Sequence, residues 1–477
     1  MLGQELDNAF AFTNAAGNIS TTDVSTRNSD KACNGRLQLG LGRNATVEYC
    51  QNGGSVRFQQ LLAGYSNVNP NNYPNTSSSN SLNRIVLNGG TFEIAGRANL
   101  GASAKENTVE FENNGATVVF SEALRIGYGT NSIVRWNHTA GETSVTNGSV
   151  WMGWFAGDKV RAYHSGGAFS VKNHIYVGTT LFSGVGANET YFEISGGAVT
   201  NSGSYSVSIG HGGVAGTKAE LKVTGNGRLY ANTLLNIGCA GSATLTIDGD
   251  GLVEVPNKAV YMSNSPSSQN YTEAGEDCRL NLMGGMLVAK GVKRQTTSGT
   301  TPGKADCIVT FDGGTLKATD SPETPFIPKD SLLSVMVGNG GGTIDTSLAS
   351  VTIASDISGV DGATGGMAFK GGNAATVTGT LSYAGATSVE MGTTLTVSSR
   401  ADVFDTGAGL VCTAPAGVSR PAARTTYSVL KTSGADAFTR TDLAKCSFSG
   451  VKDAVFALSD GGKTIICKHT GLLIYVR

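Results

Sequence analysis

The chain has 477 residues, of which 35 are Lys or Arg and 36 are Asp or Glu, so its formal net charge is −1. That balance gives no electrostatic reason to expect nucleic acid or an anionic membrane as a partner. No apolar run approaches the roughly 20 residues that span a bilayer, and residues 1–5 do not begin a signal peptide, so a leader is expected to be missing or removed.

Residues 1–30 are polar and rich in Asn, Thr and Ser, which predicts an N-terminal lead-in or cap. After them a motif of apolar, any residue, apolar, Gly recurs along the chain, for example as Leu124-Arg125-Ile126-Gly127. Its regular glycines, at intervals of 25 to 32 residues, are Gly101, Gly127, Gly153, Gly178, Gly210 and Gly238. A period in this range is typical of repeat proteins, whose stacked units share one continuous core.

Each repeat also holds a glycine turn followed by apolar residues two and four positions later, as in Gly167, Phe169 and Val171. Another apolar alternation precedes the turn, so each repeat contains three short strands with one face inward. A sandwich or barrel needs hairpin turns, and a propeller needs four strands and about 40–45 residues per blade. The constant order of strands and glycines instead predicts an all-β parallel β-solenoid with coils of about 25–30 residues and capped ends.

This β-helix is expected to occupy residues 31–337, with irregular insertions. The insertions are 65–82, 263–278 and 293–306. Repeat proteins usually place such insertions as loops on one face.

Residues 338–399 contain Gly341-Gly342-Thr343-Ile344-Asp345 and, later, Tyr383-Ala384-Gly385-Ala386-Thr387. These segments resemble the autotransporter-associated β-strand repeat of bacterial passenger domains. The coils of 84–255, most clearly Leu234–Val255, resemble a related repeat of type V secreted and PEP-anchored surface proteins. Both resemblances imply a right-handed parallel β-helix on the cell exterior, and neither implies an activity. Residues 400–477 are predicted to form a β-rich cap over the last open coil.

The middle residue of the glycine motif must face outward, because its two apolar neighbours face the core. Successive copies place Arg125, Trp151 and Tyr176 there, while Tyr128 and Trp154 occupy matching positions after the glycine. Adjacent coils lie about 4.8 Å apart, so these five side chains are predicted to form one outward patch. Such a patch can stack on sugar rings or anchor a protein. Alternatively, the 65–82 loop covers it, or it stabilises neighbouring coils.

Other patterns predict no catalytic, metal or cofactor residue. Gly210-His211-Gly212 resembles a polygalacturonase segment, but the other motifs of that family are missing. Asp248-Gly249-Asp250 occurs once, whereas calcium-binding repeats carry Asp in every copy. His164 is expected to be a hydrogen-bonded core residue. A solenoid face can still bring two carboxylates together from adjacent coils, as glycoside hydrolysis requires.

The eight cysteines include no Cys-x-x-Cys pair. Cys278 and Cys307 each stand just before an apolar alternation. If they are equivalent positions on adjacent coils, their Cα atoms lie about 4.8 Å apart, which is within disulfide range. The sequence leaves open whether they form a disulfide or two buried thiols.

The sequence therefore predicts a non-enzymatic, adhesin-like β-solenoid, extracellular or on the cell surface, exported by bacterial-type secretion. Its expected partner is a polysaccharide or the surface of a host or neighbouring cell, without nucleic acid, cofactor or a membrane-spanning segment. A β-helical polysaccharide lyase or glycoside hydrolase is the competing hypothesis. A fibre subunit that stacks end to end is a third, which capped ends would oppose.

Overall fold

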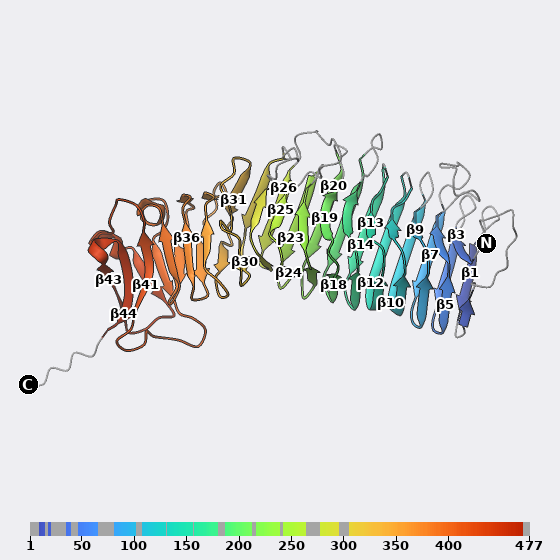
Figure 1. Cartoon of the computed structure of the whole chain (residues 1–477), viewed down its shortest axis with the longest axis horizontal. Coiled ribbons are helices and arrows are strands. Elements are labelled where there is room, and N and C mark those ends of the chain that lie inside the picture. Colours follow the sequence, from blue (N-terminus) through green and yellow to red (C-terminus); the bar gives the residue numbers. More distant parts are fainter. Residues whose placement is uncertain are drawn as a thin grey trace, which may run out of the picture.

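The protein is described from a computed structural model, which places these residues: 9–14, 18–20, 35–39, 46–64, 81–101, 107–129, 131–155, 157–179, 187–211, 216–238, 242–263, 277–294 and 305–470. They wind into a right-handed parallel β-helix of about 11 turns, which confirms the predicted fold. Figure 1 shows the coils following one another along a single rod. The predicted insertions fall mainly outside the described residues, as does most of the predicted lead-in.

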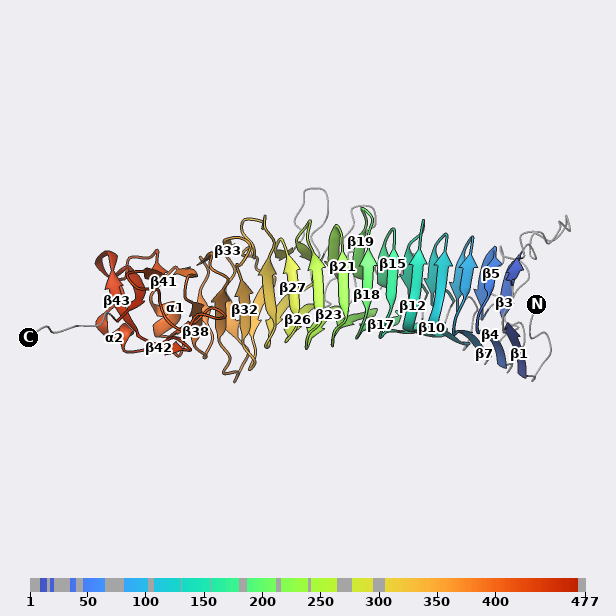
Figure 2. The same ribbon diagram turned by 90° about the horizontal axis from the view of Figure 1, so that it is seen from below.

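The strands of successive coils stack into three columns, seen from a second side in Figure 2. The first column is β1 (Ala9–Asn14), β4 (Thr46–Gln51), β7 (Leu82–Leu87), β10 (Thr108–Phe120), β12 (Ile133–Val145), β14 (Lys159–His164), β17 (Glu189–Ile194), β20 (Lys218–Val223), β23 (Ser242–Asp248), β26 (Cys278–Met283), β29 (Cys307–Phe311), β31 (Leu333–Val337), β34 (Ile357–Gly359) and β37 (Leu381–Ser382). β10 and β12 bend and run on into the second column, which joins the two columns into one connected sheet.

The second column continues along the same sheet. Besides the ends of β10 and β12, it contains β2 (Asn18–Ser20), β5 (Ser55–Phe58), β8 (Thr91–Ile94), β15 (Ala168–Val171), β18 (Ala198–Asn201), β21 (Arg228–Ala231), β24 (Leu252–Val255), β27 (Met286–Ala289), β30 (Thr315–Ala318), β32 (Gly342–Asp345), β35 (Met367–Lys370), β38 (Thr387–Glu390), β40 (Leu410–Thr413) and β42 (Cys446–Ser449). Every neighbouring pair in these two columns is parallel.

The third column carries the glycine motif. It contains β3 (Arg36–Leu39), β6 (Gln60–Ala63), β9 (Ala98–Leu100), β11 (Leu124–Ile126), β13 (Val150–Met152), β16 (Ile175–Thr179), β19 (Ser206–His211), β22 (Leu234–Ile237), β25 (Val260–Met262) and β28 (Val292–Arg294), and after a gap β33 (Val351–Ile353), β36 (Ala374–Val377), β39 (Thr394–Val397) and β41 (Thr426–Thr432). Phe326 and Ile327 bridge the gap, because Val292 N–H donates to the Phe326 carbonyl and Ile327 pairs with Ile353. The face therefore stays continuous.

Alternation of inward and outward side chains fills most of the interior. In β17 every second side chain is buried, and the inward residues of all three columns form one hydrophobic core. Because the strands pair in register, like residues stack on like residues. The rings of Phe111 and Trp136, for example, lie parallel with centroids 4.2 Å apart.

The motif glycines turn the chain out of the third column. Gly178 has φ +70°, a left-handed conformation that costs other residues roughly 1–2 kcal/mol. A Cβ atom at this position would lie 2.5 Å from the Cβ of Ala219 on a neighbouring coil. Both the backbone conformation and the close packing therefore require glycine here.

The parallel order ends near the C-terminus. β44 (Thr464–His469) pairs antiparallel with β41, and β43 (Ala454–Ser459) pairs antiparallel with β44. Two short helices, α1 (Ala401–Phe404) and α2 (Arg440–Leu443), and a 3₁₀ turn, η1 (Asp460–Gly462), lie among these strands. The division of the chain at residues 30, 337 and 399 stays a prediction.

Cys278 and Cys307 pair directly across β26 and β29, so the predicted register is confirmed. Both side chains are buried, and no disulfide joins the two residues. In this structure the two residues are therefore buried thiols and do not form a disulfide.

Substitution of Gly178 tests the packing of the corner. Gly178→Ala should lower the free energy of unfolding by about 2–4 kcal/mol, since left-handed strain and overpacking add. Gly362→Ala is the matched control, because Gly362 has φ +74° but no atom within 4 Å of its added Cβ; it should cost only about 1 kcal/mol. Urea unfolding measures both values, and equal losses would contradict the packing argument.

Candidate functional site

The five residues of the predicted patch do lie together. Arg125, Trp151 and Tyr176 pair rung by rung across β11, β13 and β16. The Trp151 and Tyr176 rings stack with centroids 4.2 Å apart. Trp154 lies 4.6 Å from Trp151, and the Arg125 guanidinium carbon lies 4.6 Å from the centre of the Tyr128 ring and 5.2 Å from that of Trp154. We call these five residues the aromatic cluster.

The cluster is less exposed than the sequence predicts. Trp154 is only 7% exposed and Tyr176 only 6%. Alternation correctly directs Trp151 and Tyr176 away from the core, but much of each ring is used in contacts with the rings beside it. Stacking aromatic rings stabilise each other by about 0.5–1.5 kcal/mol beyond the area they bury. The geometry is thus that of packing between coils, and a ligand-binding role for these five residues stays a prediction.

Histidines extend the aromatic cluster toward the next coil. The His174 ring stacks on the Tyr176 ring with centroids 4.7 Å apart, and the centroid of the His211 ring lies 4.5 Å from that of Tyr176. His174 also lies 4.6 Å from Tyr205, which is 48% exposed. Its Nδ1 lies 3.0 Å from the Ser206 hydroxyl. His211 therefore takes part in ring packing, and its Gly-His-Gly context has a structural explanation.

Two histidines of the first column lie inside the core and have strongly lowered pKa values. The Nδ1 atoms of His138 and His164 are 2.8 Å apart, so one ring donates to the other. Burial lowers the pKa of each to about 4, and for His164 the neighbouring His138 lowers it further. Both rings are fully buried, as the sequence predicts for His164. Because neither ring reaches solvent, the pair has no access to a substrate.

Asp158 is a second buried titratable group. Burial raises its pKa to about 8 although its oxygens accept hydrogen bonds from Phe155 N–H at 2.9 Å and from the Ser132 hydroxyl at 2.8 Å. At neutral pH the native protein therefore holds mainly the neutral acid. Ser132 precedes β12 and Asn188 precedes β17, in the positions equivalent to Asp158, so a buried polar column runs along this corner.

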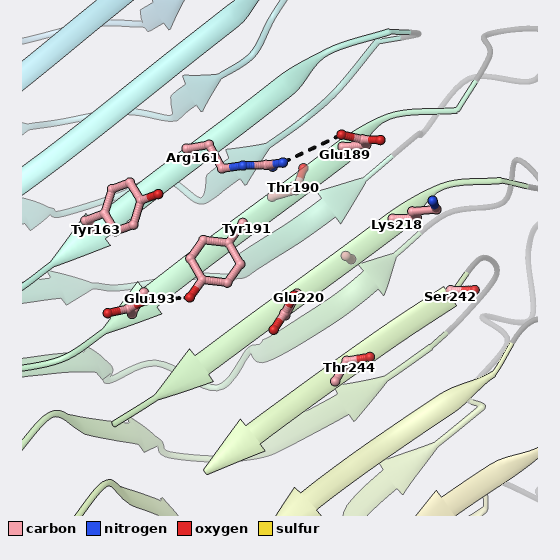
Figure 3. Close-up of a pocket in the computed structure, with 11 residues that line it drawn as sticks. Arg161, Tyr163, Glu189, Thr190, Tyr191, Glu193, Lys218, Glu220, Ser242 and Thr244 are labelled. Atoms are coloured by element: carbon pink, nitrogen blue, oxygen red, sulfur yellow. Dashed lines mark hydrogen bonds and ion pairs between the residues drawn. The ribbon is translucent and has the colours of Figure 1, made fainter. Parts of the chain in front are cut away.

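An open groove of about 670 Å³ crosses the outer face of the first column, over β14, β17, β20 and β23 (Figure 3). We call it the tyrosine groove. Its lining residues are Arg161, Tyr163, Glu189, Thr190, Tyr191, Glu193, Lys218, Ala219, Glu220, Ser242 and Thr244. Tyr163 is 39% exposed, and its ring centroid lies 5.9 Å from that of Tyr191 on the next coil. Two aromatic surfaces thus line one open depression.

Carboxylates surround the two rings. The Tyr191 hydroxyl donates to Glu193 Oε2 at 2.5 Å, and burial together with this bond raises the pKa of Tyr191. Arg161 forms an ion pair with Glu189 at 3.6 Å. Glu220 stands beside Tyr191 on the next strand and makes no ion pair with any residue that the structure describes. The groove therefore offers stacking surfaces, carboxylate acceptors and an uncompensated negative charge.

The sequence alone did not predict this groove. Tyr163, Tyr191 and Glu193 sit at outward positions of alternating strands, where any polar residue is acceptable. If the strands are aligned by the glycine motif, Arg161, Tyr191 and Glu220 occupy equivalent positions on three adjacent coils. This alignment could have predicted that the three side chains are neighbours. The alignment gives neighbours, but it does not tell whether the surface above them is hollow.

Two further properties bear on the site. Within the described segments, no group of three or more His, Cys, Asp or Glu side chains is arranged to hold a metal ion. The helices described here are single turns, and none could cross a bilayer.

Comparison with known proteins identifies no relative. No protein family, no curated protein and no solved structure was found to match the chain. The likeness to autotransporter and surface-protein repeats therefore rests on the residues that carry it.

Truncation of Trp154 tests the packing role of the aromatic cluster. Trp154→Ala should lower the free energy of unfolding by about 2–4 kcal/mol, because it removes a ring that is mostly covered. Tyr205→Ala removes a half-exposed ring and should change it by no more than about 0.5 kcal/mol. Equal, small effects in urea unfolding would show that the cluster contributes little to packing.

The buried groups predict a stability maximum near pH 6.5. As pH falls from 6.5 toward 4, the unfolded chain binds protons at His138, His164 and His211 that the native rings exclude, because burial lowers the pKa of each to about 4, so stability is lost. As pH rises from about 4 to 8, native Asp158 retains a proton that the unfolded chain releases, so its contribution is lost in that direction. Below pH 6.5 the three histidines outweigh the single acid.

Urea midpoints at pH 4.5, 6.5 and 8.5 measure this profile. Asp158→Asn should abolish the decline between pH 6.5 and 8, while lowering stability overall, because its amide nitrogen cannot accept the Phe155 N–H. If the stability of this variant still declines between pH 6.5 and 8, another titrating group causes the decline.

Proposed function

We propose that this protein is a carbohydrate-binding β-solenoid of the bacterial cell exterior, and that it binds a glycan in the tyrosine groove. One observation carries the proposal: Tyr163 and Tyr191 lie side by side in an open groove whose walls carry carboxylates. The apolar face of a sugar stacks on aromatic rings, and its hydroxyls donate to carboxylate oxygens. The remaining groove residues supply further polar contacts from Ser242 and Thr244.

The charges of the groove favour neutral or amino-bearing glycans. Arg161 is engaged by Glu189, and Lys222, which pairs with Glu193 across the strands, forms an ion pair with Asp248 at 3.4 Å. Lys218 also lines the groove, so two cations, Arg161 and Lys218, stand against three carboxylates, Glu189, Glu193 and Glu220, and the lining has a formal charge of −1. A polymer rich in carboxylate or sulfate groups would be repelled there, since like charges brought together cost binding energy.

The adhesin-like role and the exterior location rest on the repeat resemblance and on shape. A rod of stacked coils is rigid along its length, because each coil pairs with the next through backbone hydrogen bonds. It holds the groove on one side, at a constant distance from either end. Display of a glycan-binding surface away from a cell envelope suits such a rod.

Glycan cleavage is the second candidate function. Glu193 and Glu220 are diagonal neighbours on adjacent strands, which places their Cα atoms about 8 Å apart. Inverting glycosidases hold two carboxyl groups roughly 6.5–9.5 Å apart, and two outward side chains on diagonal positions of adjacent strands can adopt rotamers that reach such a separation. Binding without cleavage remains the better-supported function, because Glu193 is already engaged by the Tyr191 hydroxyl.

A glycan array tests the proposed function. The wild-type protein should bind neutral or amino-bearing glycans, and Tyr163→Ala or Tyr191→Ala should weaken that binding about tenfold, or roughly 1.4 kcal/mol. Tyr205→Ala, an exposed tyrosine outside the groove, is the matched control and should bind normally. Normal binding by folded Tyr163→Ala and Tyr191→Ala variants would remove the groove as the site.

Products from the bound glycans decide between the two functions. Mass spectrometry after long incubation should detect intact chains only. Shortened chains that disappear with Glu220→Gln would establish cleavage instead.

A further inference from the structure

Two thiols meet inside the C-terminal end of the core. Cys412 lies on β40 in the second column, and Cys467 lies on β44 in the antiparallel sheet. Both side chains are fully buried. The two thiols are neighbours across the core, although the residues are 55 positions apart in the chain.

The strands beyond them confirm that the two sheets face each other at this point. β42 pairs with β40 and places Phe448 beside Cys412, while β43 pairs with β44 and places Phe456 beside Cys467. The Phe448 and Phe456 rings stack with centroids 4.0 Å apart and planes at 3°. The ring pair thus closes the end of the core over the two thiols.

We propose that Cys412 and Cys467 form a disulfide when the chain folds in the presence of a small disulfide oxidant such as oxidised glutathione. The cross-link would tie the last parallel strands to the antiparallel sheet that ends the solenoid. It joins two strands that share no hydrogen-bonded ladder, so it adds a constraint that the backbone pairing does not supply.

Thiol–disulfide exchange forms this bond. The thiolate of one of the two cysteines attacks one sulfur of oxidised glutathione and releases one glutathione thiolate. The other cysteine, after losing its proton, attacks the protein sulfur of that mixed disulfide and releases the second glutathione thiolate. Two protein thiols are oxidised and one glutathione disulfide is reduced to two thiols. Because both sulfurs are buried, this exchange takes place before the cap closes.

Cys446 is the nearby thiol that geometry excludes as the partner of Cys412. It pairs with Leu410, two residues before Cys412, so its Cα lies about 8 Å from that of Cys412, beyond the reach of a disulfide. Its thiol donates instead to the Asp442 carbonyl at 3.3 Å.

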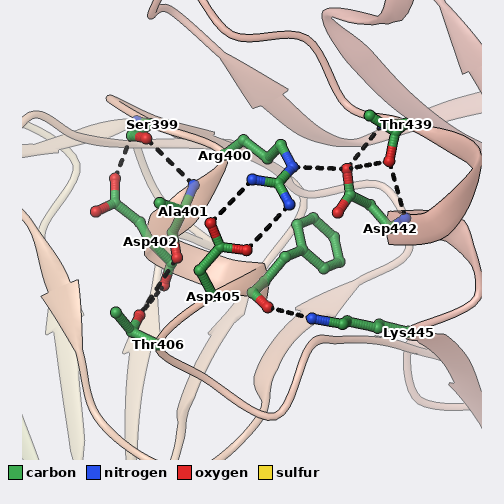
Figure 4. Close-up of polar contacts among 10 residues, drawn as sticks. Ser399, Arg400, Ala401, Asp402, Asp405, Thr406, Thr439, Asp442 and Lys445 are labelled. Atoms are coloured by element: carbon green, nitrogen blue, oxygen red, sulfur yellow. Dashed lines mark hydrogen bonds and ion pairs between the residues drawn. The ribbon is translucent and has the colours of Figure 1, made fainter.

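Asp442 is itself held in place by a polar network that connects α1 and α2 (Figure 4). Arg400 donates to Asp442 at 2.9 Å and to both carboxylate oxygens of Asp405 at 2.9 and 3.0 Å. Cys446→Ser therefore serves as a control within the same cap.

The test refolds the full chain from urea with oxidised or with reduced glutathione, then blocks remaining thiols and maps peptides by mass spectrometry without reduction. The oxidised sample should contain a Cys412–Cys467 cross-linked peptide. Its melting temperature should exceed that of the reduced sample by several degrees, in the wild type and in Cys446→Ser. Cys412→Ser and Cys467→Ser should show no such difference between the two samples.

The oxidised sample is unfolded in urea without reductant before its thiols are blocked, and alkylation of both Cys412 and Cys467 in that sample would overturn the proposal. A cross-link from either residue to Cys446 would do the same. If a serine variant fails to fold, the peptide map of the wild type and its melting shift on reduction still decide the question.

Discussion

Parallel, in-register stacking of successive coils is the constraint on which the rest of this structure depends. Each residue lies about 4.8 Å from its equivalent in the next coil, so a sequence position becomes a column of side chains. Inward columns are mostly apolar, as Phe111 and Trp136 illustrate, and the inward histidines His138 and His164 are partnered with each other from adjacent coils. In one outward column Glu48, Arg84, Glu110 and Arg135 alternate in sign and form ion pairs at 2.8 to 3.4 Å. Arg161 follows Arg135 in that column and forms its ion pair with Glu189.

The same stacking produces two different aromatic surfaces. In the third column, aromatic residues follow one another directly and are joined by others from the corner after the glycine, so the rings cover one another. In the first column, Tyr163 and Tyr191 are offset by one row and are flanked by smaller or charged residues. Their rings remain partly exposed beside a depression. Both surfaces are aromatic. The offset between the rings on adjacent coils is what leaves the tyrosines of the first column within reach of a ligand.

A stack of parallel coils must also end, because its last strands would otherwise present unpaired backbone groups. Here β44 reverses direction and β43 follows it, which changes the partners available to every side chain nearby. Residues that periodicity would never bring together, such as Cys412 and Cys467, become neighbours. The end of the solenoid is therefore where pairing depends on the path of the chain and not on the repeat.

The repeat in the sequence determined the fold class, three strands per coil, the direction of each side chain, the grouping of Arg125 with Trp151 and Tyr176, and the register of Cys278 with Cys307. All of these follow from period and alternation, which act along the stack. Only the tertiary structure decided how far Trp154 is covered, where the surface forms a groove, and which thiols meet at the cap. Those features depend on side-chain volume across neighbouring columns and on the final reversal of the chain. Neither of these repeats along the sequence, so the repeat pattern could not predict them.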